Sequence, residues 1–209
     1  MAEYDGSDST AERAGSYHHG DLRSALLSHA LQIVDADGPD SITLRGIAKA
    51  AGVSRAAPYH HFKDKRTLLA AVAASGFRQL AAQMRGKLAD RAAPRTRLDQ
   101  LGVGYVEFSL LHGELFRLMQ GADFRKPGEF PDLDAARNES AAPLIETVSA
   151  CLPDASEQTI RSACASAWSM VHGMAQLSAD GRIDSLLNLS NLEKAVGAVT
   201  QSLNLEVYE

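Results

Sequence analysis

Six basic side chains gather in one short stretch of the chain, where together they could bind a polyanion. Between positions 41 and 70 they are Arg45, Lys49, Arg55, Lys63, Lys65 and Arg66. The same stretch holds one acidic residue, Asp64, so its net charge is +5 in a chain of formal net charge −5. Residues 76–209, by contrast, hold 13 basic and 17 acidic residues, a net charge of −4. A compact basic segment on an acidic protein is typical of nucleic-acid binding, although a merely solvated basic helix face has the same composition.

The residues around these charges predict two short helices joined by a tight turn. Thr43 can cap a first helix, and Ile42 and Ile47 on either side of it have the spacing of a hydrophobic staple. Gly52 allows the positive φ that a tight turn requires, and Ser54 can cap a second helix. Two helices joined in this way predict a helix-turn-helix, whose second helix fits the DNA major groove.

We expect the two helices over residues 43–51 and 54–61. Ala48 is small enough for the two helices to cross closely. Pro58 would break a helix in its interior, but with a cap at Ser54 it falls in the opening turn, where few hydrogen bonds are lost.

This block resembles the DNA-binding domain of the TetR family of regulators over about residues 17–77. The matching positions, all in register, are Ile47-Ala48, Ala51-Gly52-Val53-Ser54, Tyr59, His61-Phe62 and Lys65. The resemblance implies a regulator that binds operator DNA as a homodimer and responds to a small molecule.

The resemblance also implies a role for each residue that would meet DNA. Those residues are Thr43, Arg45, Ser54, Arg55, Ala56, Tyr59, His60, His61 and Lys65. Arg45 would reach a base edge, and Arg55 either a base or only a phosphate. Thr43, Tyr59, His61 and Lys65 match positions that touch phosphates, and Ser54 can offer a hydroxyl or an amide to one.

Two of these positions have two possible roles each. His60 either faces DNA or lies idle in solvent, and Ala56 either meets a thymine methyl group or simply allows close approach.

The elements that position this segment are helical throughout, since no stretch alternates polar with β-branched residues. We expect an all-α fold of about nine helices in three parts. These are a disordered N-terminal tail over 1–16, a three-helix DNA-binding domain over 17–66, and a helical effector-binding and dimerisation domain over 67–209. Within the last part, Gly76 interrupts a long helix and Pro94 marks a boundary.

The C-terminal part contains a weaker resemblance. Trp168, His172 and Gly173 are similar to the Trp, His-Gly pattern of one type of C-terminal regulatory domain. Trp168 and His172 share a helix face and could line a ligand cavity, or both could be ordinary core residues. Phe108, His112, Phe116 and Met119 offer the same two interpretations.

Small residues at 162–167 and the C-terminal helix are the predicted dimer contact. A dimer would place two recognition helices about one helical turn of DNA apart, ~34–36 Å.

The sequence gives little support for an enzyme, a metal-sensing regulator or a membrane protein. The chain has no nucleophile elbow, Walker loop, zinc-protease motif or dinucleotide fingerprint, so we expect no catalytic residue and no cofactor. Cys151 and Cys164 lack metal-ligand spacing, which disfavours a metal-sensing regulator. Without a signal peptide or a spanning apolar run, we expect a bacterial cytoplasmic, nucleoid-associated protein with no membrane partner.

Repression relieved by an apolar effector is the expected mechanism. An activator and an effector-independent regulator remain alternatives, and an architectural DNA-binding protein would not need the large apolar C-terminal part.

Overall fold

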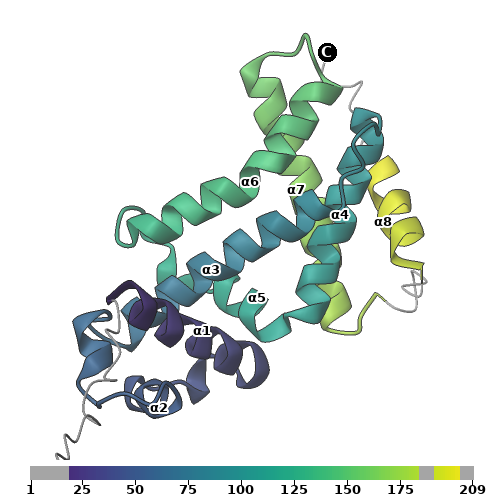
Figure 1. The fold of residues 1–209 in the computed structure, drawn as a ribbon. Helices are drawn as coiled ribbons and strands as arrows, with labels where there is room; N and C mark the ends of the chain where they lie inside the picture. Colours follow the sequence, from purple (N-terminus) through teal and green to yellow (C-terminus); the bar gives the residue numbers. More distant parts are fainter. Residues whose placement is uncertain (1–18, 184–190, 203–209) are drawn as a thin grey trace, which may run out of the picture.

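The computed structural model describes residues 19–183 and 191–202, which form eight α-helices and three short 3-10 helices. No strand occurs among these described residues, which confirms the predicted all-α class. The helices divide between a small end, formed by the first two, and a larger bundle formed by the others (Figure 1).

The small end contains the segment predicted to form the helix-turn-helix. α1 (His19–Asp37) lies across it, followed by the 3-10 turn η1 (Pro39–Ser41), α2 (Leu44–Ala50) and the 3-10 turn η2 (Ala57–His60). Its core is aliphatic and aromatic, with Leu26, Val34, Ile42, Ile47 and Phe62 all essentially buried. Burying such side chains stabilises the fold by about 1.5–3 kcal/mol each, so this short segment holds together through its apolar face.

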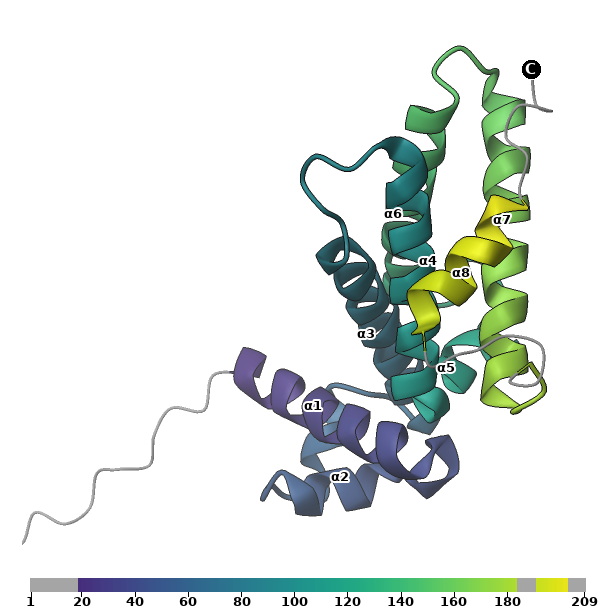
Figure 2. The same cartoon turned by 90° about the vertical axis from the view of Figure 1, so that its right-hand side faces the viewer.

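The long helix α3 (Lys65–Gly86) joins the two ends. It leaves the small end and packs on α4 (Pro94–Leu111), α5 (Gly113–Gln120) and α6 (Pro131–Cys151) (Figure 1). The 3-10 turn η3 (Ala122–Phe124) connects α5 to the loop before α6. Figure 2 shows α1 lying across the foot of this bundle, where it packs on α5.

The last two described helices are α7 (Glu157–Ala179) and α8 (Leu192–Gln201). Both pack on α4, and the α6–α7 hairpin projects from the end opposite α1 and α2 (Figures 1 and 2). Among the described residues, no helix is long and apolar enough to cross a membrane.

The recognition segment differs from its prediction. Instead of an α-helix over 54–61, the chain forms a single 3-10 turn over Ala57–His60. Pro58 has no N–H to donate to the carbonyl of Ser54, and Ala57 N donates to that carbonyl instead, over 3.1 Å. The predicted side-chain cap at Ser54 is also wrong, because the turn begins after Ala56 and has no side-chain cap.

Other local predictions can be compared directly. Thr43 caps α2, its hydroxyl accepting from Gly46 N over 3.0 Å, and Gly52 has φ +67°. Pro94 stands at the start of α4 as expected. Gly76 does not interrupt α3; a Cβ there would lie 2.6 Å from Met119 Sδ, so glycine allows α5 to approach closely.

Two predictions fall wholly or partly outside the described residues. The N-terminal tail over 1–16 lies outside them entirely. Of the predicted C-terminal helix, only Leu192–Gln201 lies among the described residues, as α8.

Candidate functional site

The basic surface of the small end is exposed. Of the nine residues that the sequence assigns to DNA, seven are exposed, namely Thr43, Arg45, Ser54, Arg55, Ala56, Tyr59 and His60, while His61 and Lys65 are half-buried. Tyr59 is 51% exposed although it is aromatic. An exposed aromatic hydroxyl among basic side chains suits phosphate contact, since it offers a donor without needing burial.

The turn that carries Tyr59 is fixed from below. Pro58 is buried, and its carbonyl accepts from both His61 N at 3.0 Å and Phe62 N at 2.8 Å. Phe62 is 1% exposed, and the guanidinium of Arg23 lies 5.4 Å from the centre of its ring. The exposed side chains of the turn therefore stand on a buried apolar anchor.

Lys65 and Arg66 follow this turn, and both contact the protein itself. Lys65 Nζ donates to the carbonyl of Asp40 over 3.2 Å, which leaves other ammonium hydrogens available for a phosphate. Arg66 belongs by sequence to the basic segment, but its guanidinium turns toward the larger bundle. The net charge of +5 therefore overstates the charge that the small end offers to a polyanion.

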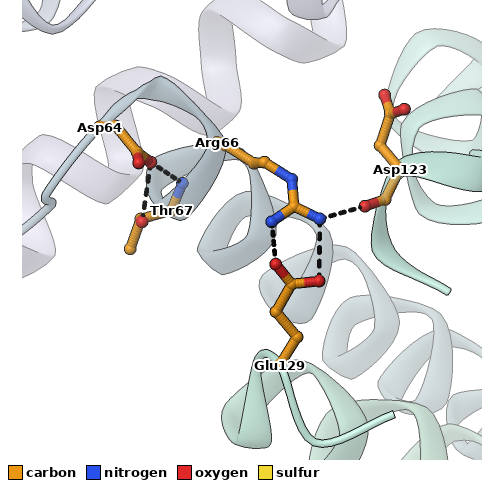
Figure 3. A network of polar contacts seen from close by, with 5 residues as sticks. All are labelled: Asp64, Arg66, Thr67, Asp123 and Glu129. Atoms are coloured by element: carbon orange, nitrogen blue, oxygen red, sulfur yellow. Dashed lines mark hydrogen bonds and ion pairs between the residues drawn. The ribbon is translucent and has the colours of Figure 1, made fainter. Parts of the chain in front are cut away.

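Figure 3 shows what Arg66 binds. Its two terminal nitrogens meet the two carboxylate oxygens of Glu129, and Nη2 also donates to the carbonyl of Asp123. Arg66 thus ties the first turn of α3 to the loop between α5 and α6. The hydrogen bond with Arg66 lowers the pKa of Glu129, and the same contact raises the pKa of Arg66.

A second contact joins the two ends through α1. Asp35 Oδ2, near the end of α1, lies 2.8 Å from Nδ1 of His112, the residue just before α5. His112 is therefore held at the junction of the two ends, and its ring packs on Phe108 at 4.8 Å between centroids.

The larger bundle holds a partly open cavity of about 690 Å³ between α3, α4, α5, α6 and α7. Its walls are mainly apolar, with Phe77, Leu80, Met84, Met119 and Leu144 among them. A volume in this range and a mainly apolar lining are usual for sites that bind drug-sized molecules.

A chain of polar groups crosses one wall. Trp168 Nε1 donates to the Tyr105 hydroxyl over 3.3 Å, and that hydroxyl lies 2.8 Å from His172 Nδ1. Burial raises the pKa of Tyr105 to about 12 and lowers the pKa of His172. Both groups are therefore uncharged at neutral pH, and they act as hydrogen-bonding anchors in an apolar wall.

The structure brings together three of the six residues considered for the ligand site. Met119, Trp168 and His172 line the cavity, and Trp168 is 52% exposed, so it is no core residue. Phe108 and Phe116 are buried, and Phe116 packs edge-on against the lining residue Tyr105, with 5.6 Å between ring centroids. His112 contacts Asp35 of α1 instead. The cavity lining therefore excludes Phe108, Phe116 and His112.

Several lining residues escaped the sequence reasoning. They include Tyr105 on α4, Gln120 at the end of α5, Arg125 in the following loop and Arg137 on α6. No local pattern marks them, because the cavity wall is assembled from five helices that are distant in sequence.

Two family models match the chain. The model described as "Bacterial regulatory proteins, tetR family" matches residues 26–72, and "Tetracyclin repressor-like, C-terminal domain" matches residues 98–196. Together they cover both the helix-turn-helix and most of the cavity-bearing bundle. The chain belongs to the TetR family of transcriptional regulators.

Curated relatives of this TetR-family regulator match it over its N-terminal part. The HTH-type transcriptional regulator AcrR of Shigella flexneri is 44% identical over 52 residues, 25% of this chain and 24% of that protein. The HTH-type transcriptional regulator BetI of Rhizobium meliloti (strain 1021) is 34% identical over 79 residues, 38% of this chain and 39% of that protein. The matched segments thus span less than half the length of these relatives, both of which are HTH-type transcriptional regulators.

Solved structures resemble nearly the whole regulator. A protein of unknown function from Rhodococcus sp. RHA1 has a TM-score of 0.74 at 33% identity, covering 90% of this chain and 95% of that one. A TetR variant from Acinetobacter baumannii AYE, solved in complex with minocycline, has a TM-score of 0.58 at 21% identity, covering 87% and 90%. The second likeness shows the fold alone.

The described part of this regulator contains no group of three or more His, Cys, Asp or Glu side chains that could hold a metal ion. Cys151 and Cys164 are free and half-buried, and burial raises the pKa of both thiols. A raised pKa makes both thiols slow nucleophiles.

Proposed function

We propose that this protein is a repressor that binds palindromic operator DNA as a homodimer and is released by a small effector with an apolar body. The observation that carries the proposal is the course of α3. This helix begins at Lys65 on the exposed basic surface and lines the cavity further along at Phe77, Leu80 and Met84. One rigid element therefore connects the surface that would meet DNA with the site that would hold an effector.

The DNA contacts divide into two kinds. Arg45 on α2 and Arg55 before η2 would read base edges, because an arginine fork matches the two acceptors of guanine in the major groove. Thr43, Tyr59, His61 and Lys65 would hold phosphates and set the docking register. The domain limits proposed for this division are 17–66 for DNA binding and 67–209 for effector binding and dimerisation.

The dimer contact would lie on α7 and α8. Gly173 in α7 and Gly197 in α8 stand inside helices, where glycine costs about 1 kcal/mol relative to alanine. A Cβ at either position would meet nothing within 4 Å in the single chain. Close approach of a second copy would account for two glycines that the single chain does not require.

Release would follow from differential affinity. An effector in the cavity shifts the regulator only if it binds the DNA-incompetent arrangement more tightly than the competent one. The loop between α5 and α6 borders the cavity at Gly121 and Arg125 and also holds Arg66 through Asp123 and Glu129, so occupancy could change the position of the small end.

Operator selection from random duplex DNA at a fixed salt concentration tests the DNA part of the proposal. A recovered palindrome with half-sites about one helical turn apart would support a dimeric regulator. Recovery of no preferred sequence would contradict operator binding by the free protein. A transcription assay on the recovered site then separates repression from activation, since only a repressor lowers the transcript level when it is added.

A further inference from the structure

The charged side chains that line the cavity are both positive. Arg125 and Arg137 both line it, and no aspartate or glutamate does. Within the described ranges, Arg125 has no ion-pair partner, and the ion-pair partner of Arg137 is Asp134, with 3.2 Å between Nη1 and Oδ1. Asp134 does not line the cavity, and it also accepts from Gly128 N over 2.8 Å. Even with Asp134 counted, one positive charge at the cavity remains uncompensated.

The uncharged polar groups add further donors. Tyr105 accepts from Trp168 Nε1, and when it donates its own hydrogen to His172 Nδ1, the hydrogen of that imidazole resides on Nε2. His172 then offers an N–H rather than a lone pair. The Ser140 hydroxyl is already used, since it donates to the Arg137 carbonyl over 2.8 Å. Gln120 and Ser169, which also line the cavity, can each donate or accept, so an anion in the cavity can find several uncharged donors.

The arginines and the apolar walls lie at different parts of the cavity. Arg125 is exposed in the loop after η3, and Arg137 is half-buried on α6, with its guanidinium 5.6 Å from the centre of the Phe77 ring. The deeper walls carry Leu80, Met84 and Met119, all at least 95% buried. A ligand that fits both parts has an apolar body and an anionic end.

We infer that the effector of this regulator is an amphipathic organic anion, with an apolar body against α3 and α5 and a carboxylate between Arg125 and Arg137. Arginine suits this ligand because its planar fork can donate two parallel hydrogen bonds to a carboxylate. The inference rests on the proposed function for the cavity's role, and it adds the chemical class of the ligand.

The test compares decanoate with decanamide, which has the same chain and a neutral head group of nearly the same shape. Trp168 is the only tryptophan of the chain and lines the cavity, so its fluorescence reports occupancy. Alkylation supplies a second readout, because Cys164 lines the cavity and Cys151 does not. We expect decanoate to bind at least about tenfold more tightly than decanamide, and to slow alkylation of Cys164 but not of Cys151.

Matched variants locate the charge. Arg125→Gln and Arg137→Gln should each reduce the preference for the acid, and the double variant should bring it close to one. Two control variants each remove one positive charge from a residue that does not line the cavity: Lys126→Gln, next to Arg125, and Arg161→Gln, on α7. Both variants should keep the preference for the acid. Decyl phosphate, as a third probe, shows whether the site prefers a carboxylate; tighter binding of the phosphate would overturn the carboxylate assignment.

Two results would overturn the inference as a whole. One is equal binding of decanoate and decanamide, and the other is failure of both to change Trp168 fluorescence or Cys164 alkylation. Operator binding, measured on the same samples without ligand, is independent of either result. If the ligand-free protein does not bind operator DNA, the proposed function is contradicted. If it binds operator DNA but the cavity does not distinguish the acid from the amide, only the ligand class is contradicted.

Discussion

Arg66 Nη2 lies 3.0 Å from Glu129 Oε2, and this pair connects the helix-turn-helix to the loop that borders the ligand cavity (Figure 3). Arg66 also lies over the rings of Phe124 and Phe130, at 5.8 and 4.9 Å from their centres. The loop between α5 and α6 is thereby packed against the first turn of α3. A change in this loop would reach the small end directly.

Glu129→Gln should weaken the effect of a cavity ligand on operator affinity, while ligand binding itself persists. The amide keeps the shape of the side chain but removes the negative charge that pairs with Arg66. Because the pair is largely exposed, the melting temperature should stay within about 3 °C of wild type. Titration of a labelled operator, with and without a saturating cavity ligand, gives the ratio of affinities that measures coupling.

Glu139→Gln is the matched control. Glu139 on α6 pairs with Arg78 on α3, with 3.2 Å between Oε2 and Nε. Arg78 lies in the middle of α3, whereas Arg66 lies in its first turn beside the small end. Equal loss of coupling in both variants would show that the Arg66 contact has no special role.

Gly76→Ala should destabilise the protein by about 1–3 kcal/mol, the usual cost of overpacking a core. The new methyl group would lie 2.6 Å from Met119 Sδ and 3.1 Å from Leu115 Cδ1, so α5 must shift or Met119 must change rotamer. Urea unfolding gives the free energy. Since Met119 lines the cavity, ligand affinity should fall as well.

Gly173→Ala provides the comparison within α7. Nothing lies within 4 Å of its added Cβ, so a single chain should gain up to about 1 kcal/mol from helix propensity. A loss of dimer at the same time, measured by sedimentation, would support a second copy packed at this glycine. A stabilised and unchanged dimer would move the proposed contact away from Gly173.

The stability of the protein should fall as the pH drops below about 6.5, in part through His172. Burial lowers the pKa of His172 in the folded protein below its ordinary value of 6.5, so the unfolded chain binds the proton more readily. The contribution is fully present above the unfolded pKa and is lost as the pH falls toward the folded one. Urea unfolding at pH 7, 6 and 5 should show a smaller loss for His172→Asn, and a larger loss in that variant would contradict a lowered pKa for His172.

Arg45→Ala and Lys65→Ala should weaken operator binding in different ways. Loss of Arg45 should relax the base preference at one position of each half-site, at a cost of about 1–3 kcal/mol. Loss of Lys65 should weaken all sequences alike and reduce the salt slope by about 0.9 for each phosphate that is no longer neutralised. Lys194→Ala on α8, a helix of the larger bundle, should change neither quantity (Figures 1 and 2). An Arg45→Ala variant with unchanged base preference would remove α2 from the base-reading surface.

The sequence alone determined the fold class and the place of the DNA-binding segment, with its first helix and tight turn. Thr43, Gly52 and Pro94 act through their own backbone or the next turn, so their roles can be read from neighbouring residues. The same local reasoning failed at Pro58, where one missing N–H converted the expected α-helix into a 3-10 turn. That outcome depends on which of two closely similar hydrogen-bond patterns the surrounding core favours.

Only the tertiary structure decided which way Arg66 points and which residues line the cavity. In the sequence, Arg66 is one of six cations in a basic segment, while Glu129 is 63 positions away and has no pattern that links them. Arg125, Arg137 and Tyr105 likewise share no motif, yet the packing of α3 to α7 places them on one cavity. Local propensities fix where helices begin and end, whereas contacts between distant side chains exist only after those helices have packed.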